Sequence, residues 1–369
     1  MTVPRPLSLD TDVPPARRVT AAGSRFEIGR SHGESQRAAI RAFLDDRTAR
    51  LGAVLGRATT LEDVAGSIEA HAAVAEAHLP AIAEEVAGLA EGAGIDRREA
   101  WLLQLRRELT GYRSVRARAG GDCTTFGRLI PAGPGPEGAV IGQTVDLNGD
   151  MAPELTVLDL TPRDTGRRVL MASFTGLLGY LGMNDRGLAV GLSLVLAGQW
   201  RPGIPGYMAI RHLLDAASTV DEALDALAAL PLASSRALTI TDGRRLVTVE
   251  HVLDERVVLE GDCQVHTNHF LHDGFAERDE LNPFALTSSR RRFDACAAML
   301  RDLPVHAGAE AYLARMAEPP IDVSAPDDIR REWTVATAIL RPDRGEMTLR
   351  RGHAMADRAV ETTPAAAGA

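Results

Sequence analysis

The residues best suited to covalent chemistry lie around Cys123, in the stretch Gly-Gly-Asp-Cys-Thr-Thr-Phe-Gly over residues 120–127. A cut between Asp122 and Cys123 would give the cysteine a free α-amine beside its thiol. That amine, with an unperturbed pKa of roughly 7.7–8.0, can accept the thiol proton while the sulfur attacks. Glycines permit unusual backbone angles, and Thr124 offers a hydroxyl donor while leaving the sulfur accessible. The simpler alternative is a buried cysteine that packs at the start of a strand.

Two polar residues further along the chain suit a site built around Cys123. Asp146 ends a predicted strand, and its carboxylate could hold the new α-amine in position. The alternative is an aspartate in a turn at the strand end. Asn268 carries an uncharged N–H donor of the kind that stabilises a tetrahedral oxyanion, although asparagine also favours left-handed turns. The presence of all three residues favours an enzyme over a protein that only binds a ligand.

Metal and disulfide chemistry fit the sequence less well. His266, His269 and His272 form an H-x-x-H-x-x-H pattern. On a strand, a spacing of three alternates faces, so these side chains do not converge on a metal unless the segment turns. The three cysteines are an odd number without zinc-ligand spacing. We therefore expect no metal site and no disulfide framework, and a reducing, cytoplasmic location.

Composition excludes several other classes of protein. All 41 basic residues are arginine, which rules out a lysine Schiff base and a phosphate-binding loop with its lysine. The net charge is −9 and no basic run occurs, so we expect no nucleic-acid partner. No apolar run is long enough to span a bilayer, so we expect no membrane association. Nothing in the sequence calls for a cofactor.

Up to the glycine-rich joint, the pattern predicts a helical leader. Residues 1–18 are rich in proline and poor in pattern, which is typical of a loose arm. A turn at residues 23–33 leads into the first helix, and Thr60 with Asp63 forms a capping box for the second. The first expected helix runs from the end of that turn to about residue 55, and the others cover residues 60–78, 80–92 and 97–109.

After Cys123 the hydrophobic pattern changes from the helical period to the period of strands. Short β-branched or alternating runs, separated by Pro and Gly turns, predict strands at residues 139–146, 155–160, 168–174, 187–195, 237–241, 246–250, 256–260, 263–268, 334–340 and 346–350. Two helices are expected within residues 205–230, the second with a capping box at Thr219 and Glu222, and another helix over residues 288–303. Residues 361–369 predict a disordered tail. Strand blocks separated by helices indicate an α+β fold of antiparallel sheets covered by helices.

Several motifs together resemble the acyl-coenzyme A:penicillin (isopenicillin N) acyltransferase family of N-terminal-nucleophile hydrolases. They follow the family's order and spacing over nearly the whole chain. They are residues 26–33, residues 88–94 with 106–108, Cys123-Thr-Thr, residues 142–146, residues 184–187 and residues 266–269.

The resemblance implies a four-layer αββα sandwich that is made as a precursor and cleaves itself before Cys123. Residues 1–122 would become the small subunit and residues 123–369 the catalytic region. The mature protein would then be a heterodimer of its own fragments, and further oligomers are possible.

The resemblance also bears on four other positions. Gln143 matches the acyltransferase branch, since related bile-salt and penicillin V hydrolases have arginine there. Arg290 resembles a position near the family's substrate pocket, although an arginine on a helix surface is the alternative. Asp122 stands where the family's fungal member has glycine. Ser193 stands where relatives usually carry an oxyanion asparagine, which leaves Asn268 and a backbone N–H as the donors.

The expected activity is cleavage or transfer of an acyl group at a non-peptide C–N bond through a thioester at Cys123. The substrate is a small N-acyl amide or acyl-thioester. Coenzyme A would need a basic patch, and the one arginine cluster after the nucleophile is residues 290–292. Hydrolysis is therefore the expected default. The alternatives are an acyl-coenzyme A-dependent N-acyltransferase and an uncleaved, non-catalytic relative that binds a ligand.

Overall fold

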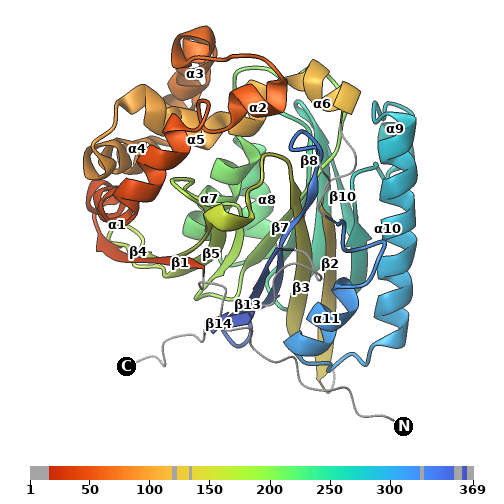
Figure 1. Cartoon of the computed structure of the whole chain (residues 1–369). Helices are drawn as coiled ribbons and strands as arrows, with labels where there is room; N and C mark the ends of the chain where they lie inside the picture. Colours follow the sequence, from red (N-terminus) through yellow and green to blue (C-terminus); the bar gives the residue numbers. More distant parts are fainter. Residues whose placement is uncertain (1–15, 119–122, 133–134, 325–327, 353–359, 364–369) are drawn as a thin grey trace.

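Two β-sheets face each other at the centre of the molecule (Figure 1). The computed structural model describes residues 16–118, 123–132, 135–324, 328–352 and 360–363. The eight-stranded sheet has the order β1-β4-β5-β6-β7-β8-β9-β10 and the six-stranded sheet the order β11-β2-β3-β12-β13-β14. The strands are β1 (Arg17–Gly23), β2 (Thr124–Ala132), β3 (Gly135–Leu147), β4 (Leu155–Pro162), β5 (Val169–Phe174), β6 (Leu181–Asn184), β7 (Ala189–Leu194), β8 (Arg236–Thr241), β9 (Leu246–Val252), β10 (Glu255–Glu260), β11 (Cys263–His266), β12 (Trp333–Arg341), β13 (Glu346–Arg351) and β14 (Val360–Thr363).

Helices cover the outer face of each sheet. Helices α1, α7 and α8 contact the larger sheet, and α10 and α11 contact the smaller one. The helices are α1 (Arg25–Asp45), α2 (Leu51–Leu55), α3 (Leu61–His78), α4 (Pro80–Ala93), α5 (Arg97–Thr110), α6 (Tyr112–Arg118), α7 (Gly206–Ala216), α8 (Val220–Ala228), α9 (Asp273–Ala276), α10 (Pro283–Asp302) and α11 (Ala309–Met316). Strands β2 and β3 contact β7 across the space between the sheets. The four-layer αββα arrangement is thereby confirmed. No helix within the described ranges is long and apolar enough to cross a membrane.

Local signals fix most of the helix starts. Thr60 caps α3 through the predicted reciprocal pair with Asp63, and Pro80 begins α4. At α8 only one of the two hydrogen bonds of the expected capping box forms. Thr219 accepts a hydrogen bond from the Glu222 N–H, but the Glu222 carboxylate accepts one from the Ser218 N–H instead. The strands predicted at residues 237–241 and 246–250 pair as the antiparallel hairpin β8–β9, which turns at Asp242 and Gly243.

Several predictions of local structure were wrong, most of them because pairing with a distant segment overrides the local pattern. Part of the expected arm forms β1, which pairs in parallel with β4. Strand β11 does not extend the meander, because it pairs with β2 in the other sheet. Residues 361–363 of the expected tail pair with β13 as part of β14. Helix α10 begins at Pro283, five residues before the predicted start, with the Asn282 side chain as its cap.

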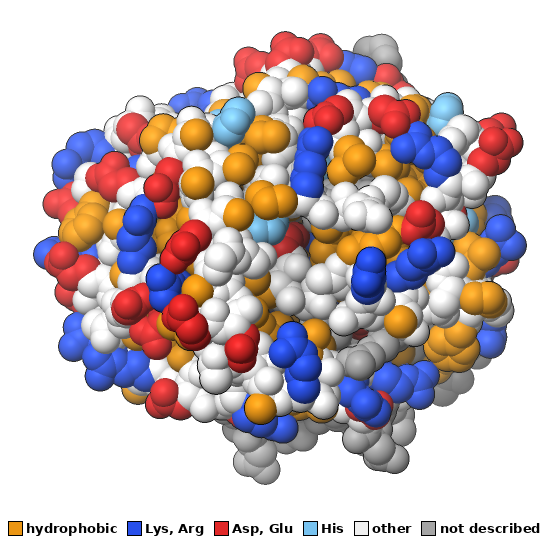
Figure 2. Space-filling view, turned by 90° about the horizontal axis from the view of Figure 1, so that it is seen from above, with side chains coloured by type: hydrophobic (Ala, Val, Ile, Leu, Met, Phe, Trp, Pro, Cys, Tyr) orange, Lys and Arg blue, Asp and Glu red, His pale blue; other side chains and the backbone are white. Residues whose placement is uncertain are grey.

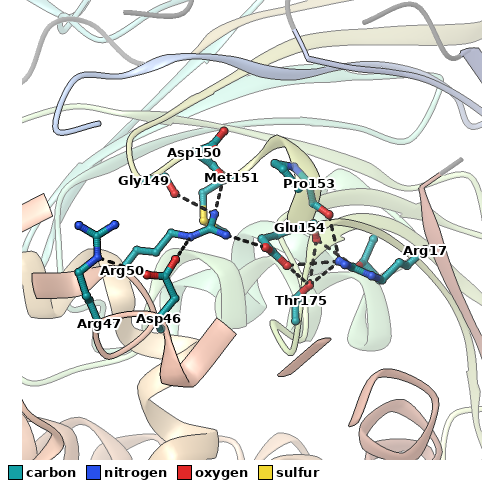
Figure 3. A network of polar contacts seen from close by, with 12 residues as sticks. Arg17, Asp46, Arg47, Arg50, Gly149, Asp150, Met151, Pro153, Glu154 and Thr175 are labelled. Carbon is teal, nitrogen blue, oxygen red and sulfur yellow. Dashed lines mark hydrogen bonds and ion pairs between the residues drawn. The ribbon is translucent and has the colours of Figure 1, made fainter. Parts of the chain in front are cut away.

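The predicted first helix is broken by a left-handed turn at residues 47–50, whose φ angles lie between 49° and 60°. This conformation costs roughly 1–2 kcal/mol for each residue other than glycine, so contacts from elsewhere must hold it. Figure 3 shows Arg50 reaching the Glu154 carboxylate at 3.0 Å and the Gly149 carbonyl at 3.1 Å. Arg17 and Thr175 bond the same carboxylate. Glu154 thus ties two leader segments to the body.

Buried ion pairs join the leader to the body at a second place. Arg211 on α7 forms a two-pronged pair with Glu85 on α4, at 2.9 and 3.0 Å. Arg25 on α1 donates to Asp215 on α7 at 2.5 Å. All four side chains are buried. Leader and body also share one hydrophobic core, so we expect the leader to stay bound if the chain is cut before Cys123.

Helices α1 and α4 cross at glycines that belong to the two leader motifs. A Cβ atom on Gly29 would lie 1.9 Å from the Glu85 carbonyl oxygen, and one on Gly88 would lie 2.1 Å from the Phe26 carbonyl oxygen. Both obstacles are backbone atoms, which cannot move aside as a side chain can. The leader motif therefore has a structural explanation: it permits this close helix crossing.

Gly88→Ala is expected to lower the free energy of unfolding by about 3 kcal/mol, because the new methyl group forces the helices apart. Gly66→Ala on α3 is the matched control, since Gly66 is exposed and nothing lies within 4 Å of its Cβ position. That change should raise the free energy of unfolding by about 0.5–1 kcal/mol. Denaturant unfolding measures both. Equal changes in the free energy of unfolding for the two variants would contradict the proposal that the motif permits the close helix crossing.

Candidate active site

Cys123 stands immediately before β2, the second strand from one edge of the smaller sheet, and is 2% exposed. Its Sγ lies 3.6 Å from the Tyr180 hydroxyl oxygen, in the segment that leads into β6. The Tyr180 ring stacks on the Tyr207 ring of α7 at 4.8 Å. Asp122 and the glycines before it lie outside the described residues. Within the described residues, the Cys123 thiol therefore lies next to the stacked rings of Tyr180 and Tyr207.

Arg292 of α10 connects the nucleophile to the predicted oxyanion donor. Its guanidinium donates to the Cys123 carbonyl oxygen at 2.9 Å and to the Thr124 hydroxyl at 3.0 Å. It also donates to the Asn268 Oδ1 at 2.6 Å. Arg292 is fully buried, and such charge-assisted hydrogen bonds are short and strong. One side chain thus brings together three predicted site residues.

These contacts fix the orientation of the Asn268 amide. An arginine can only donate, so the atom that faces Arg292 must be the carbonyl oxygen. The Nδ2 atom then faces the Leu194 carbonyl oxygen, to which it donates at 2.9 Å. The backbone N–H of Asn268 donates to the Ser289 hydroxyl at 2.8 Å. The amide is therefore held at both ends, and an NH₂ group with a fixed direction suits oxyanion stabilisation.

Asn268→Ala is expected to lower kcat by roughly 10²–10³, if the amide is an oxyanion donor. Asn268→Asp is the matched variant, because it keeps an oxygen for Arg292 but removes the N–H donor. Steady-state kinetics on both variants, with cleavage before Cys123 checked separately by mass, tests the role. A fully processed Asn268→Ala protein with normal kcat would remove this residue from the site.

The strand register places Asp146 beside the start of β2. Thr124 pairs with Thr144 of β3, and its N–H donates to the Thr144 hydroxyl at 3.0 Å. Asp146 lies two residues further along β3, on the same face as Thr144, because side chains alternate along a strand. Its buried carboxylate accepts a hydrogen bond from the Thr334 hydroxyl at 2.7 Å. The carboxylate is thus near the end of β2 where an α-amine of Cys123 would lie.

Gln143 and Ser193 join the two sheets. The Gln143 amide donates to the Leu192 carbonyl oxygen and accepts from the Leu192 N–H, both at 2.8 Å. The Ser193 hydroxyl lies 3.1 Å from the Thr125 hydroxyl. Both side chains are buried, and neither lines the pocket described below. Their contacts fix the position of β7 against β2 and β3, close to the nucleophile.

Arg290 lies apart from these contacts, and among the three histidines His269 shares a partner with Asn268, the Ser289 hydroxyl. Arg290 is exposed on α10, and its neighbour Arg292 occupies the site instead. His266 bonds the Glu250 carboxylate at 2.9 Å, while His269 bonds the Ser289 hydroxyl at 2.8 Å and His272 packs against a phenylalanine. Within the described ranges, no group of His, Cys, Asp and Glu is arranged to hold a metal.

Sequence reasoning missed Arg292, although a signal was available. The buried positions of α10 include Ala285, Ser289, Arg292, Cys296 and Met299, which follow helical spacing. An arginine on that stripe faces the protein interior, where a charge requires partners. Arg290 lies off the stripe. The missing step was to extend the helix back to Pro283, which makes the stripe visible.

A pocket with about 40 Å³ of space for water-sized molecules lies beside Tyr180. Leader helices form one wall and the body forms the other. Most of its residues are apolar or aromatic: Phe43, Leu51, Val54, Leu103, Gln104, Arg106, Arg107, Thr110, Leu147, Asn148, Met151, Phe174, Thr175, Leu177, Tyr180 and Tyr207. Such a pocket suits an apolar group of a small molecule.

Residues 134–354 match the model of the acyl-coenzyme A:6-aminopenicillanic acid acyl-transferase family. This range is more than half of the chain. It contains Asp146, Asn268 and Arg292, and it begins after Cys123.

Solved structures with a similar chain path include three hydrolases. Penicillin V acylase from Agrobacterium tumefaciens is 17% identical with a TM-score of 0.47, and the match covers 66% of this chain and 86% of that chain. A mutant of conjugated bile acid hydrolase from Clostridium perfringens is 13% identical with a TM-score of 0.44, covering 65% and 92%. The ortholog of N-acylethanolamine-hydrolyzing acid amidase from Caenorhabditis elegans is 15% identical with a TM-score of 0.45, covering 60% and 93%.

Proposed function

Because this chain belongs to the acyl-coenzyme A:6-aminopenicillanic acid acyl-transferase family, we propose that it cleaves itself before Cys123 and then hydrolyses a linear amide. The observation that carries the proposal is the set of bonds from Arg292 to Cys123, Thr124 and Asn268. They hold a thiol and an N–H donor in one buried site beside an apolar pocket. A thiol nucleophile and an N–H donor for the oxyanion are the groups that covalent acyl transfer requires.

In the acylation step the Cys123 sulfur attacks the amide carbonyl carbon, and the thiol proton passes to the α-amine of the same residue. Asp146 holds that amine on the proper side of the sulfur. The carbonyl oxygen becomes negative in the tetrahedral intermediate, and the Asn268 NH₂ group stabilises it. The C–N bond then breaks, the proton moves to the leaving nitrogen, and the acyl group remains as a thioester.

In the second step a nucleophile removes the acyl group from Cys123. Water adds to the thioester carbonyl, the α-amine takes a proton from it, and the C–S bond breaks. The products are a carboxylic acid and the restored thiol. An amine held at the same place would take the acyl group instead, so the outcome depends on which nucleophile is positioned better.

The charge of the molecule favours hydrolysis over acyl transfer from coenzyme A. The molecule has a net charge of −9 and no lysine. Figure 2 shows arginine and acidic side chains interspersed over the face viewed from above, rather than a large patch of one sign. Arg292 is occupied within the site, which leaves Arg290 and Arg291 of the downstream cluster for other contacts. We therefore place hydrolysis first and transfer from coenzyme A second.

A substrate panel tests the proposal. The processed protein is given N-acyl amines and acyl-coenzyme A thioesters, each with and without an added amine. Amide turnover in water alone is the expected result. Strict dependence on an acyl-coenzyme A donor, with no amide cleaved, would assign the transferase alternative. Binding of amides to a chain that is never cut or acylated would indicate the non-catalytic alternative.

A further inference from the structure

The loop that carries Asn268, residues 267–272 between β11 and α9, is held by side chains from three parts of the fold. Each backbone N–H from residue 268 to residue 272 donates to a side chain. The acceptors are Ser289 for residues 268 and 269, Asp279 for residue 270, and Glu250 for residues 271 and 272. A loop whose N–H groups all have partners in the protein is held in one conformation.

Glu250 connects this loop to the other sheet. It stands on β9 of the larger sheet and is fully buried, whereas the loop follows β11 of the smaller sheet. Its Oε1 accepts from the Leu271 N–H at 2.6 Å and lies 2.9 Å from the His266 Nε2. Its Oε2 accepts from the His272 N–H at 3.1 Å. One carboxylate therefore holds both ends of the loop.

Both ring nitrogens of His266 face acceptors. Nδ1 lies 2.7 Å from the Thr267 carbonyl oxygen, which can only accept, so Nδ1 carries a proton. Nε2 needs a second proton to donate to Glu250. Burial by itself raises the pKa of Glu250, but His266 and the two backbone N–H groups bring it below its ordinary value. The contacts therefore favour an imidazolium beside a carboxylate, which is a stronger link than a neutral hydrogen bond.

The loop begins beside the nucleophile. His266 pairs with Thr125 of β2, the strand that Cys123 precedes. Arg292 and the Leu194 carbonyl oxygen hold the Asn268 side chain. Those two bonds aim the amide correctly only if the backbone of the loop lies in the right place, and a displacement of about 1 Å can cost 10²-fold in rate.

We propose that Glu250 is a positioning residue, which acts through His266 and the N–H groups of residues 271 and 272 to aim the Asn268 amide at the oxyanion. This inference rests on the proposed amidase function and adds a residue to its site. Glu250 does not touch the substrate in this account. Its effect on the reaction should therefore depend on Asn268 and should appear in kcat rather than in KM.

Glu250→Gln keeps the shape of the side chain, but its NH₂ group faces an N–H donor in either orientation. With the amide that the wild-type protein hydrolyses fastest, we expect kcat to fall about 10- to 100-fold and KM to stay within about twofold. Glu255→Gln is the matched control, since Glu255 is exposed on β10 and pairs with Arg278 at the surface. It should change neither constant. An unchanged kcat in Glu250→Gln would overturn the proposal.

A double-mutant cycle separates positioning from a general loss of stability. In an Asn268→Ala protein, Glu250→Gln should change kcat by no more than about twofold, because the group that it positions is already gone. Equal losses of kcat with and without Asn268 would overturn the proposal.

Two changes of His266 give an independent comparison. His266→Gln keeps an N–H donor for Glu250 and should retain most of kcat. His266→Phe keeps a ring without a donor, and we expect it to lose about as much kcat as Glu250→Gln. Equal kcat in the two His266 variants would show that the link to Glu250 does not act in catalysis.

Hydrogen exchange followed by NMR tests the positioning without turnover or self-cleavage. In Glu250→Gln the N–H groups of residues 268 and 269 keep Ser289 as their acceptor, yet they should exchange at least about 10-fold faster because the loop is released. Unchanged exchange at these two residues would overturn the inference. Faster exchange in a protein that hydrolyses no amide would support the positioning and overturn the amidase. Amide turnover with unchanged exchange would do the reverse.

Discussion

Replacing Cys123 with alanine is expected to abolish amide turnover, with a loss of about 10⁶-fold in kcat. In the proposed mechanism the Cys123 sulfur forms the thioester, and no other described side chain replaces it at this position. The same change should leave the chain uncut, because the sulfur is also the attacking atom in the proposed self-cleavage. Steady-state kinetics and denaturing electrophoresis measure the two effects.

Cys263→Ala is the matched control, since Cys263 is exposed and lies on β11, away from Tyr180. It should retain both cleavage and turnover. A Cys123→Ala protein that hydrolyses amides at the wild-type rate would exclude the thioester mechanism altogether.

Arg292→Gln is expected to have the second largest effect, a fall in kcat of roughly 10²–10³ with a lower free energy of unfolding. Its bonds orient the Asn268 amide and hold the Cys123 carbonyl oxygen, so a shorter neutral side chain leaves buried acceptors without partners. Arg290→Gln, two residues earlier on the exposed face of α10, should change neither quantity. Kinetics together with thermal unfolding separate the two effects.

Arg292→Gln with unchanged kcat on a stable fold would show that these hydrogen bonds serve packing alone. A large effect of Arg290→Gln would instead support the role that the resemblance assigned to that residue.

The sequence predicted best where a short-range signal decides the structure. The capping pair at Thr60 and Asp63, the start of α4 at Pro80 and the turn at Asp242 and Gly243 each depend on residues within a few positions of one another. The change from helical to strand period also located Cys123 at the start of β2. These signals were sufficient to predict the layered α+β fold.

Prediction failed where distant residues decide the structure. Strand β11 is the next strand after β10 along the chain, and only its pairing with β2 places it in the other sheet. The left-handed turn at residues 47–50 depends on Arg50 reaching Glu154, more than a hundred residues away. Arg292 resembles its exposed neighbours in sequence, and its three bonds exist only once β2, α10 and the segment after β11 have met.

The pocket could not be predicted at all, for a related reason. Its walls combine Phe43 and Leu103 from the leader with Phe174 and Tyr180 from the body. Such a surface forms only when the α1–α4 crossing and the Glu85–Arg211 pair have fixed the leader against the body. The leader thus lines the pocket beside Tyr180, and in the proposed self-cleavage it is also the segment whose separation frees the α-amine of Cys123.

The intact mass of the purified wild-type protein tests the central claim most directly. Self-cleavage predicts two fragments, residues 1–122 and residues 123–369, whose masses together equal the precursor plus one water. They should remain associated under native conditions, and the amine of Cys123 should react with an amine-specific reagent. A single full-length chain that hydrolyses amides, with residue 123 still joined to residue 122, would contradict the N-terminal-nucleophile mechanism.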